Sequence, residues 1–540
     1  MVISPGLLML LLVPLVLIPS GRKGRAVVSL AILFAGLLRH FTPVVGGEFI
    51  LGFFGHRLEL YSYTFVAQTL GGVYLLAGFC YLVFLVNRDR GRWFYFFSIS
   101  HLASAASILF VGDLWSFFIF WELLTISAVV LILLDGKPLL ARNYFLFHIA
   151  GGISLLTGMA IFYGTGQSGF PVISGGFESI PVLFFLLAVF IKAAVFPFHY
   201  WLVGIYPKLG FDLTALFAAT TSKIGALGAW YLLPGINLEF VGLVMALGAV
   251  IHTLCLLKPG KFLAYHILGR VGLIVAGAGG GGLILHQAGV YQAASSVVYM
   301  GLLFMIFYHL RKSDGNYEQS AAVNWYLGIG FVAGVLSITG MPGFNSFINK
   351  TLFSRGLEGE LATTLFYTLE TLTVVSFVRF IHLYFISDTR WKKSRIDMAF
   401  LDKAALLLLV ALSLFMGIAP GVISGGTIGT EVEFFTAWNI SRTLFLIPMG
   451  VFVYGLFYWL PKVATIGEVI SASRQGLLWI YKYFFGKGLD FLQNIHTGNL
   501  RHYLFWVFGA LLVTWLYFLY QVESEFIFDN LLRVVSVFTG

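Results

Sequence analysis

Four charged residues lie within long apolar segments, where a charge is costly unless a polar interior surrounds it. Glu122 lies in GDLWSFFIFWELLTISAVVLIL, and Lys192 lies in FFLLAVFIKAAVFPFHYWLV. Lys223 lies in LFAATTSKIGALGAWYLL, and Lys350 in SITGMPGFNSFINKTLF. Burial favours the neutral forms of carboxyl and amine groups, whereas pairing favours their charged forms, so neighbouring charges can move a proton between them. The four residues therefore predict a path for protons or cations.

Other ionisable residues in apolar segments have simpler interpretations. Glu370 and Arg379 share the segment TTLFYTLETLTVVSFVRFIHLYF, and a structural charged pair is the role we expect for them. His199, His252 and His286 are candidate relays, although a packing role is favoured for any single histidine. A structural ion pair remains an alternative for Lys192 and Lys223, and a purely structural role for Glu122.

Two of these segments contain helix breakers beside the charged residue. Pro197 follows Lys192 by five residues, and Gly340-Met341-Pro342-Gly343 precedes Lys350. A break within the bilayer frees backbone polar groups, which are tolerated only in a buried or hydrated interior. Paired broken helices at corresponding places are typical of transporters built from inverted repeats.

The composition is that of an integral membrane protein. Of 540 residues, 59% are hydrophobic and 11% are charged, against about 25% charged in soluble domains. The net charge of +9 comes from basic residues in short loops, so we expect no nucleic-acid partner. The two cysteines, Cys80 and Cys255, form no CxxC motif, so the chain is expected to hold no metal, cofactor or catalytic centre of its own.

Apolar segments of bilayer-spanning length predict an all-α, polytopic transmembrane helical bundle with about fourteen to sixteen spans. Basic loop residues follow every second span, beginning with Arg22, Lys23 and Arg25, which predicts an outside N-terminus and cytoplasmic basic loops. The candidate spans are 4–20, 26–40, 64–86, 93–111, 114–134, 143–164, 181–205, 212–234, 240–257, 262–284, 289–310, 323–353, 362–386, 404–422, 443–460 and 503–520.

Five segments, in this order, resemble a known family. They are GDLWSFFIFWELLTIS, FIKAAVFPFHYWL, TTSKIGALGAWYLL, KPGKFLAYHILGRVGLIVAG and ITGMPGFNSFINK. Together they resemble the antiporter-like membrane subunits shared by respiratory complex I, membrane-bound hydrogenase and sulfur-reductase complexes, and Mrp-type cation/proton antiporters. The resemblance runs from about Gly112 to Arg379, roughly half of the chain.

The resemblance implies two inverted five-helix repeats, each forming a half-channel. Glu122 and Lys192 would belong to the first, Lys223 would link to the second, and Lys350 would be its exit. The implied divisions are N-terminal transmembrane helices (1–92), the first repeat (93–234), the second repeat (240–388), C-terminal transmembrane helices (404–460), an amphipathic lateral helix (461–502), and a last transmembrane helix with a tail (503–540).

One helix departs from the family pattern. In VYQAASSVVYMGLLFMIF, Met300 stands where the family carries a Lys and Ser296 where it carries a His. The central relay is therefore depleted. His266, which replaces a small polar residue, is the preferred substitute, with His252 and His286 as further candidates.

Three hypotheses follow for the function. The first is a proton- or sodium-translocating subunit of a multisubunit respiratory redox complex in the plasma membrane. Its partners would be lipid, antiporter-like subunits and redox-module subunits that carry iron–sulfur clusters and other redox centres. The second is a subunit of an Mrp-type Na⁺/H⁺ antiporter. The third is a structural paralogue that carries no ions.

Overall fold

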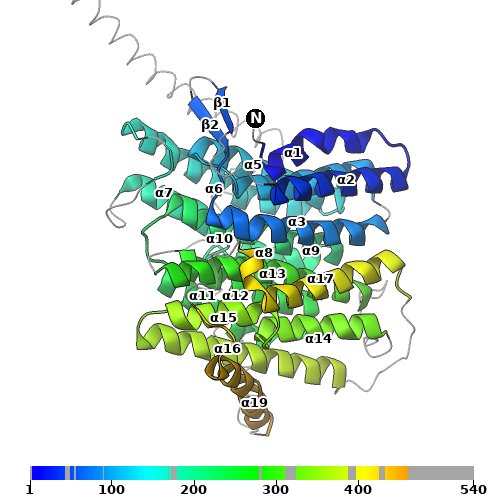
Figure 1. Ribbon diagram of the computed structural model, residues 1–540, viewed down its shortest axis with the longest axis vertical. Coiled ribbons are helices and arrows are strands. Elements are labelled where there is room, and N and C mark those ends of the chain that lie inside the picture. Colours follow the sequence, from blue (N-terminus) through cyan, green and yellow to red (C-terminus); the bar gives the residue numbers. More distant parts are fainter. Residues whose placement is uncertain are drawn as a thin grey trace, which may run out of the picture. The chain divides into compact units, whose positions relative to one another are not determined.

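Helices make up most of the chain, because helices satisfy their own backbone hydrogen bonds in lipid (Figure 1). The computed structural model describes residues 3–459, except for 43–48, 54–55, 89, 168, 172–178, 279–281, 311–323, 387–396 and 425–431. These residues belong to one unit, Met1–Leu460. The expected lateral helix at 461–502 and the last expected span at 503–520 lie outside the described residues.

The N-terminal part consists of helices and one β-hairpin that sequence reasoning missed. Strand β1 pairs antiparallel with β2, and the backbone N–H of Glu59 in β2 donates to Asp113 Oδ2 at 2.6 Å. Asp113 also caps α5, because its Oδ1 accepts from the backbone N–H of Ser116 at 2.9 Å. The elements are α1 (Pro5–Leu12), η1 (Val13–Leu17), α2 (Arg22–Phe41), β1 (Phe49–Phe53), β2 (His56–Tyr61), α3 (Phe65–Val86), α4 (Arg92–Ile108), α5 (Leu114–Leu134) and α6 (Pro138–Gly164).

Three predicted spans are divided by breaks. The two breaks expected from Pro197 and from Gly340 to Gly343 are present, and a third break at Thr220 was not predicted. The resulting helices are α7 (Ile180–Lys192) and α8 (Tyr200–Ile205), then η2 (Tyr206–Lys208), α9 (Phe211–Ala219) and α10 (Thr221–Leu232), and later α14 (Trp325–Thr339) and α15 (Asn345–Gly356). Lys192, Lys223 and Lys350 therefore each lie at or within a few residues of a break.

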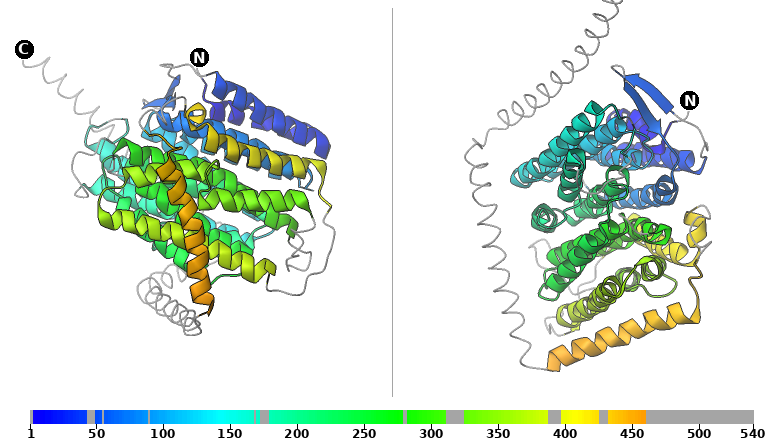
Figure 2. Two further views of the ribbon diagram at one scale, coloured as in Figure 1. Left: turned by 60° about the horizontal axis from the view of Figure 1, so that its bottom comes forward. Right: turned by 90° about the vertical axis from the view of Figure 1, so that its left-hand side faces the viewer.

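Helix α13 (Leu283–Leu310) lies at the centre of the unit. Its apolar window is completely buried, and it packs against α3, α9, α12, α14, α15 and α17. The remaining helices are α11 (Glu239–Thr253), α12 (Pro259–Ala278), α16 (Glu360–Ile381), α17 (Phe400–Ile418), α18 (Pro420–Ile423) and α19 (Ala437–Trp459), with a π-helical turn at His382–Ile386 after α16. In the right-hand view of Figure 2, many helices are seen end-on whereas α19 crosses them.

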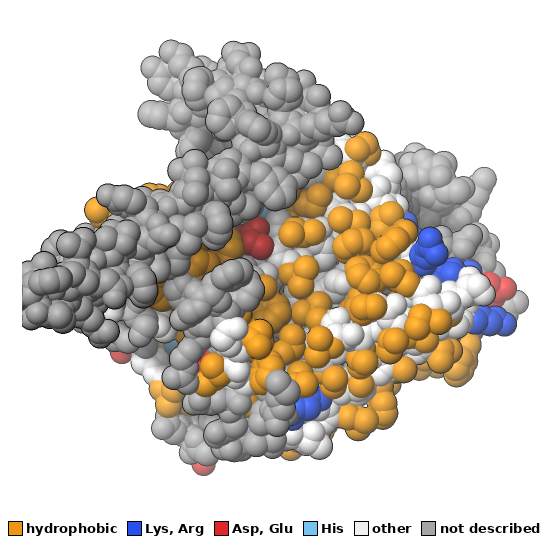
Figure 3. Space-filling view, turned by 90° about the horizontal axis from the view of Figure 1, so that it is seen from above, with side chains coloured by type: hydrophobic (Ala, Val, Ile, Leu, Met, Phe, Trp, Pro, Cys, Tyr) orange, Lys and Arg blue, Asp and Glu red, His pale blue; other side chains and the backbone are white. Residues whose placement is uncertain are grey.

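The described residues have the exposed apolar surface of a membrane protein. They include nine helices long and apolar enough to cross a membrane, together with four shorter apolar helices. The face seen in Figure 3 is mainly hydrophobic, with Lys and Arg side chains near its edge. The chain is thus a multi-pass membrane protein. Among the described residues, full-length spans are fewer than predicted for two reasons: breaks divide three of them, and the helices within 4–20, 93–111 and 240–257 are shorter than a full span.

Candidate functional site

Lys192 is the last residue of α7, and its amino group is held by α5. Its Nζ donates to the Trp121 carbonyl and to Thr125 Oγ1, both at 2.7 Å, and lies 4.5 Å from the centre of the Trp121 ring. The side chain is 1% exposed. The break after α7 thus delivers a fully enclosed ammonium group to two oxygen acceptors and an aromatic face.

Glu122 follows Trp121 on the same helix. Its Oε1 is buried and has no hydrogen-bond partner among the described residues, where it also forms no ion pair within 4 Å. Gly152 of α6 makes room for this carboxylate, because a Cβ at that position would lie 2.4 Å from Oε1. Glu122 and Lys192 therefore belong to one polar region without direct contact, which leaves both groups able to respond to a moving charge.

Lys223 lies in the first turn of α10, directly after the break at Thr220. Its side chain is completely buried, and its amino group donates to the carbonyl of Ala218 in α9. The break frees carbonyl groups at the end of α9, and the lysine satisfies one of them. Gly225 packs against the backbone of Lys192, since a Cβ there would lie 2.6 Å from its carbonyl carbon. The segments carrying these two lysines are thus in contact.

A second charged cluster joins α12, α15 and α16. Glu370 forms ion pairs with Lys350 and with Arg270, whose Nη1 lies 3.3 Å from Glu370 Oε1. Arg270 also donates to Thr373 Oγ1 at 2.7 Å. The three charged side chains are almost fully buried and carry a net charge of +1. Gly340 touches Lys350, so this break also positions its lysine.

The expected pair of Glu370 with Arg379 is wrong. The two residues are nine positions apart on α16, which places them on opposite faces of the helix at 100° per residue. Glu370 pairs instead with Arg270 and Lys350, whereas Arg379 donates to the Leu256 carbonyl at 3.4 Å. Sequence reasoning missed Arg270, although a charge within KFLAYHILGRVGLIVAG was a readable signal.

Of the predicted histidines, His266 lies beside the second cluster. It precedes Arg270 by one turn of α12, and its Nε2 lies 3.1 Å from Ser376 Oγ on α16. His252 faces the Gly248 carbonyl and stacks on Tyr265.

His286 packs against Trp230, and His199 against Phe196 and Tyr200. Both histidine rings pack against aromatic side chains, and these ring contacts involve none of the buried lysines. A role as relays for His199, His252 and His286 stays a prediction.

The centre of α13 is polar but uncharged. Met300 and Ser296 are fully buried there, as are Gln292 and Tyr299, whose side chains are hydrogen-bonded at 2.9 Å. Asn349, the residue before Lys350, donates to the Gln292 side-chain oxygen. Methionine and serine therefore occupy the positions where charged groups were expected, and the amide and hydroxyl groups of Gln292 and Tyr299 lie on the same helix near the second cluster.

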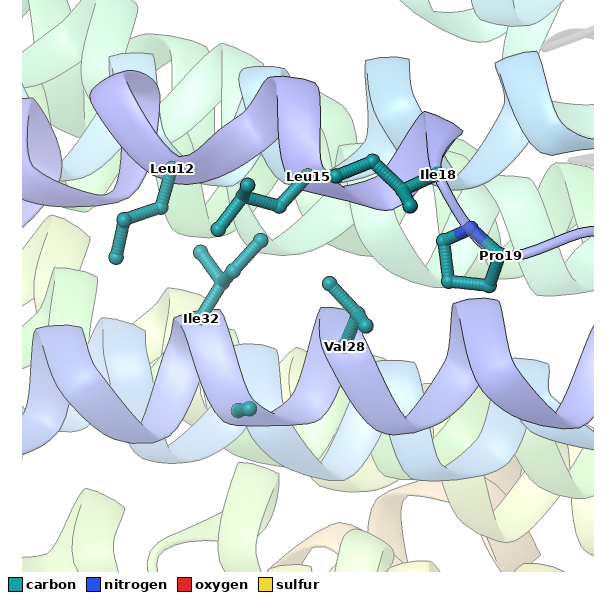
Figure 4. Close-up of a pocket in the computed structure, with 7 residues that line it drawn as sticks. Leu12, Leu15, Ile18, Pro19, Val28 and Ile32 are labelled. Carbon is teal, nitrogen blue, oxygen red and sulfur yellow. The ribbon is translucent and has the colours of Figure 1, made fainter.

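The described part of the chain contains no candidate metal site. No group of three or more His, Cys, Asp or Glu residues in it could hold a metal ion. A groove between η1 and α2 is lined by Leu12, Leu15, Ile18, Val28, Ile32 and other apolar residues (Figure 4), with no titratable side chain.

The chain is similar to several known proteins. Residues 111–373 match the family described as "NADH:quinone oxidoreductase/Mrp antiporter, TM". A Na⁺/H⁺ antiporter subunit from Bacillus subtilis (strain 168) is 26% identical over 62% of this chain and 74% of its own length. The antiporter subunit mnhA2 of Staphylococcus aureus is 25% identical over 79% of this chain, which spans only 62% of that protein.

Two solved structures have a similar fold, each with 18% sequence identity. One is the membrane-bound sulfane sulfur reductase, an archaeal respiratory membrane complex, with a TM-score of 0.72 over 94% of this chain and 98% of that chain. The other is the Mrp complex from Dietzia sp. DQ12-45-1b, with a TM-score of 0.70 over 94% of this chain and 62% of that chain. The central region of the chain therefore matches this family model, and the chain has the fold of these polytopic membrane subunits.

Proposed function

We propose that this chain translocates protons, or sodium ions, as the antiporter-like membrane subunit of a multisubunit respiratory redox complex of the complex I, membrane-bound hydrogenase or sulfur-reductase type. One observation carries the proposal. Lys192, Lys223 and Lys350 are almost fully buried, each lies at a helix break, and each is held by oxygen acceptors from another helix. Buried charges in membrane proteins are costly and are retained where ions move.

The three lysines differ in the strength of their partners, and this difference suits stepwise transfer. Lys350 has a carboxylate partner, Lys192 has a carbonyl and a hydroxyl, and Lys223 has a carbonyl. A neutral acceptor stabilises an ammonium group less than a carboxylate does. A charge arriving near Lys192 or Lys223 would therefore displace a proton more easily than one arriving near Lys350.

A redox complex is favoured over a sodium/proton antiporter by the extent of the structural match. The fold covers 98% of the matching chain in the sulfur reductase, but 62% of the matching chain in the Mrp complex. Iron–sulfur clusters and other redox centres would then reside in partner subunits. We further propose location in the plasma membrane, with the N-terminus outside and the basic loops cytoplasmic.

The Mrp-type alternative is supported by the curated relatives, which are antiporter subunits. Purifying the native complex through a tag on this chain and identifying its subunits separates the two. Redox subunits and substrate-driven ion movement in proteoliposomes support the first function. Sodium/proton exchange without any redox substrate supports the second. Ion movement in neither assay, from an intact complex, contradicts both.

The role of the lysines and Glu122 has its own test in the same vesicles. Glu122→Gln and Lys192→Ala are expected to lower ion translocation about a hundredfold, because each removes a group that must bind or release the moving charge. Glu360→Gln and Lys261→Ala are matched controls, since both side chains are exposed, and should leave translocation unchanged. If Glu122→Gln and Lys192→Ala both translocate ions at the wild-type rate, these two residues have only a structural role.

A further inference from the structure

A buried histidine outside the predicted set lies between the first two lysine sites. His101 of α4 is completely buried. Its Nδ1 lies 3.0 Å from Ser127 Oγ and 3.2 Å from the Leu124 carbonyl oxygen, both on α5. Its Nε2 lies 2.7 Å from Thr220 Oγ1, at the break between α9 and α10, and 3.3 Å from the hydroxyl of Thr221.

The protons on the Nδ1 side can be assigned from the hydrogen bonds. The Ser127 hydroxyl donates its proton to the Leu124 carbonyl at 3.0 Å. Both oxygens facing Nδ1 are then acceptors, because a carbonyl can only accept and the serine has used its proton. Nδ1 of His101 therefore carries a hydrogen in the neutral ring, and Nε2 is the nitrogen free to bind another proton.

The Nε2 side has two satisfied states. The Thr220 hydroxyl has one proton and two acceptors within reach, Nε2 and the Leu216 carbonyl at 2.9 Å. When the ring is neutral, the hydroxyl donates to Nε2. When Nε2 is protonated, it donates to Thr220 Oγ1, and the hydroxyl turns to Leu216. Nε2 and the Thr220 hydroxyl are paired in both states, so neither incurs the usual penalty for an unpaired buried polar group.

The position of the ring connects the two lysine sites. Leu124 is adjacent to Thr125, which accepts from Lys192, and Thr220 precedes Lys223 by three residues. Lys192 is the charged group that acts on the ring electrostatically. Glu122 on α5, Asp212 on α9 and Lys223 on α10 are the other charged groups on the neighbouring helices whose residues contact the ring.

We propose that His101 holds a proton in transit between the Glu122–Lys192 region and Lys223, with Thr220 as its positioning residue. The proposal rests on the proposed function. Uptake forms one N–H bond at Nε2 and turns the Thr220 hydroxyl toward Leu216. Release breaks that bond and lets the Thr220 hydroxyl turn back to Nε2. The proton comes from the Glu122–Lys192 region on uptake and passes to the neutral amine of Lys223 on release. The ring gains one positive charge on uptake and loses it on release, so no other reactant is needed.

The experiment compares His101→Gln, Thr220→Val and Thr220→Ser in the intact complex in proteoliposomes, with proton movement followed by a pH-sensitive dye. Glutamine can form hydrogen bonds but cannot carry the proton, and valine keeps the shape of threonine without its hydroxyl. We expect proton translocation to fall at least about tenfold in both and to be retained in Thr220→Ser. Thr157→Val, at an exposed threonine on α6, is the matched control.

The pH profile separates a relay from a structural brace. A relay predicts that Thr220→Val changes the pH dependence of the rate, because the protonated and neutral rings no longer have equally good partners. The proposal is overturned, and His101 is a structural brace, if only His101→Gln lowers the translocation rate or if Thr220→Val lowers it equally at every pH. Glu122→Gln is run in parallel. If it blocks translocation while His101→Gln does not, only the relay fails; if it also transports normally, the proposed function fails.

Discussion

At the scale of residues, the second charged cluster contains one carboxylate that pairs with two cations. Glu370 contacts Arg270 and Lys350, and all three side chains are nearly inaccessible. Arg270 is always charged, because guanidinium groups do not lose their proton in proteins. Because the arginine keeps its charge, Lys350 is the cation of the cluster that can change charge.

This arrangement predicts that the three residues differ in their effect on stability. Glu370→Gln leaves two buried cations without a counter-charge and should lower the free energy of unfolding by about 3–5 kcal/mol. Lys350→Met leaves the balanced pair of Arg270 with Glu370 and should cost clearly less. Melting temperatures of the purified variants in detergent check the order, and an equal loss in both variants would contradict the assignment of charges.

The same cluster shows what sequence alone could and could not predict about residues. Apolar flanks identify Glu122, Lys192, Lys223 and Lys350 as buried, since hydropathy reports depth in the membrane. The pairing of charges depends on which helix faces meet, and this is decided by tertiary packing, which hydropathy does not report. The sequence therefore suggests a partner for Glu370 on its own helix, whereas its partners Arg270 and Lys350 lie on α12 and α15.

At the scale of elements, breaks were predictable where proline and glycine cause them. Pro197 and the segment Gly340 to Gly343 remove helical hydrogen bonds or favour a left-handed backbone, so their sequence carries the signal. The break at Thr220 lies in AATTSK, which contains no such residue, and it was missed. The hairpin of β1 and β2 was also missed, because its pairing is completed by contacts with the start of α5.

The break before Lys350 can be tested through two glycines with similar backbone geometry. Gly340 has a φ of +79° and Gly343 a φ of +91°, so alanine at either position should cost roughly 1–2 kcal/mol of stability. Only Gly340→Ala should also impair ion translocation, because its Cβ would lie 2.4 Å from Lys350 Cδ, whereas nothing lies within 4 Å of a Cβ at Gly343. The comparison requires stability and translocation to be measured on both variants. Equal translocation in the two variants would contradict a role of the break in positioning Lys350.

At the scale of the whole molecule, a native cysteine can be used to test the proposed orientation of the chain in the membrane. Cys255 is exposed and lies close to Lys258 and Lys261, in a loop expected to be cytoplasmic, whereas Cys80 is buried. A membrane-impermeant maleimide should therefore label Cys255 in inside-out vesicles and not in intact cells. Cys255→Ser, which retains only Cys80, is the control for background. Labelling in intact cells would reverse the proposed orientation.

The whole molecule also raises the question of whether the two charged regions act on the same ion. Lys192 and Lys223 are linked through the contact of α7 with α10, and the neutral chain of Gln292, Tyr299 and Asn349 leads to Lys350. We predict one shared path, in which this neutral chain connects the two charged regions. Lys192→Ala and Lys350→Ala should then each abolish translocation, and the double variant should be no worse than either single variant, as for residues that act as a unit. Two independent paths would instead show a partial loss in each single variant and a complete loss only in the double variant.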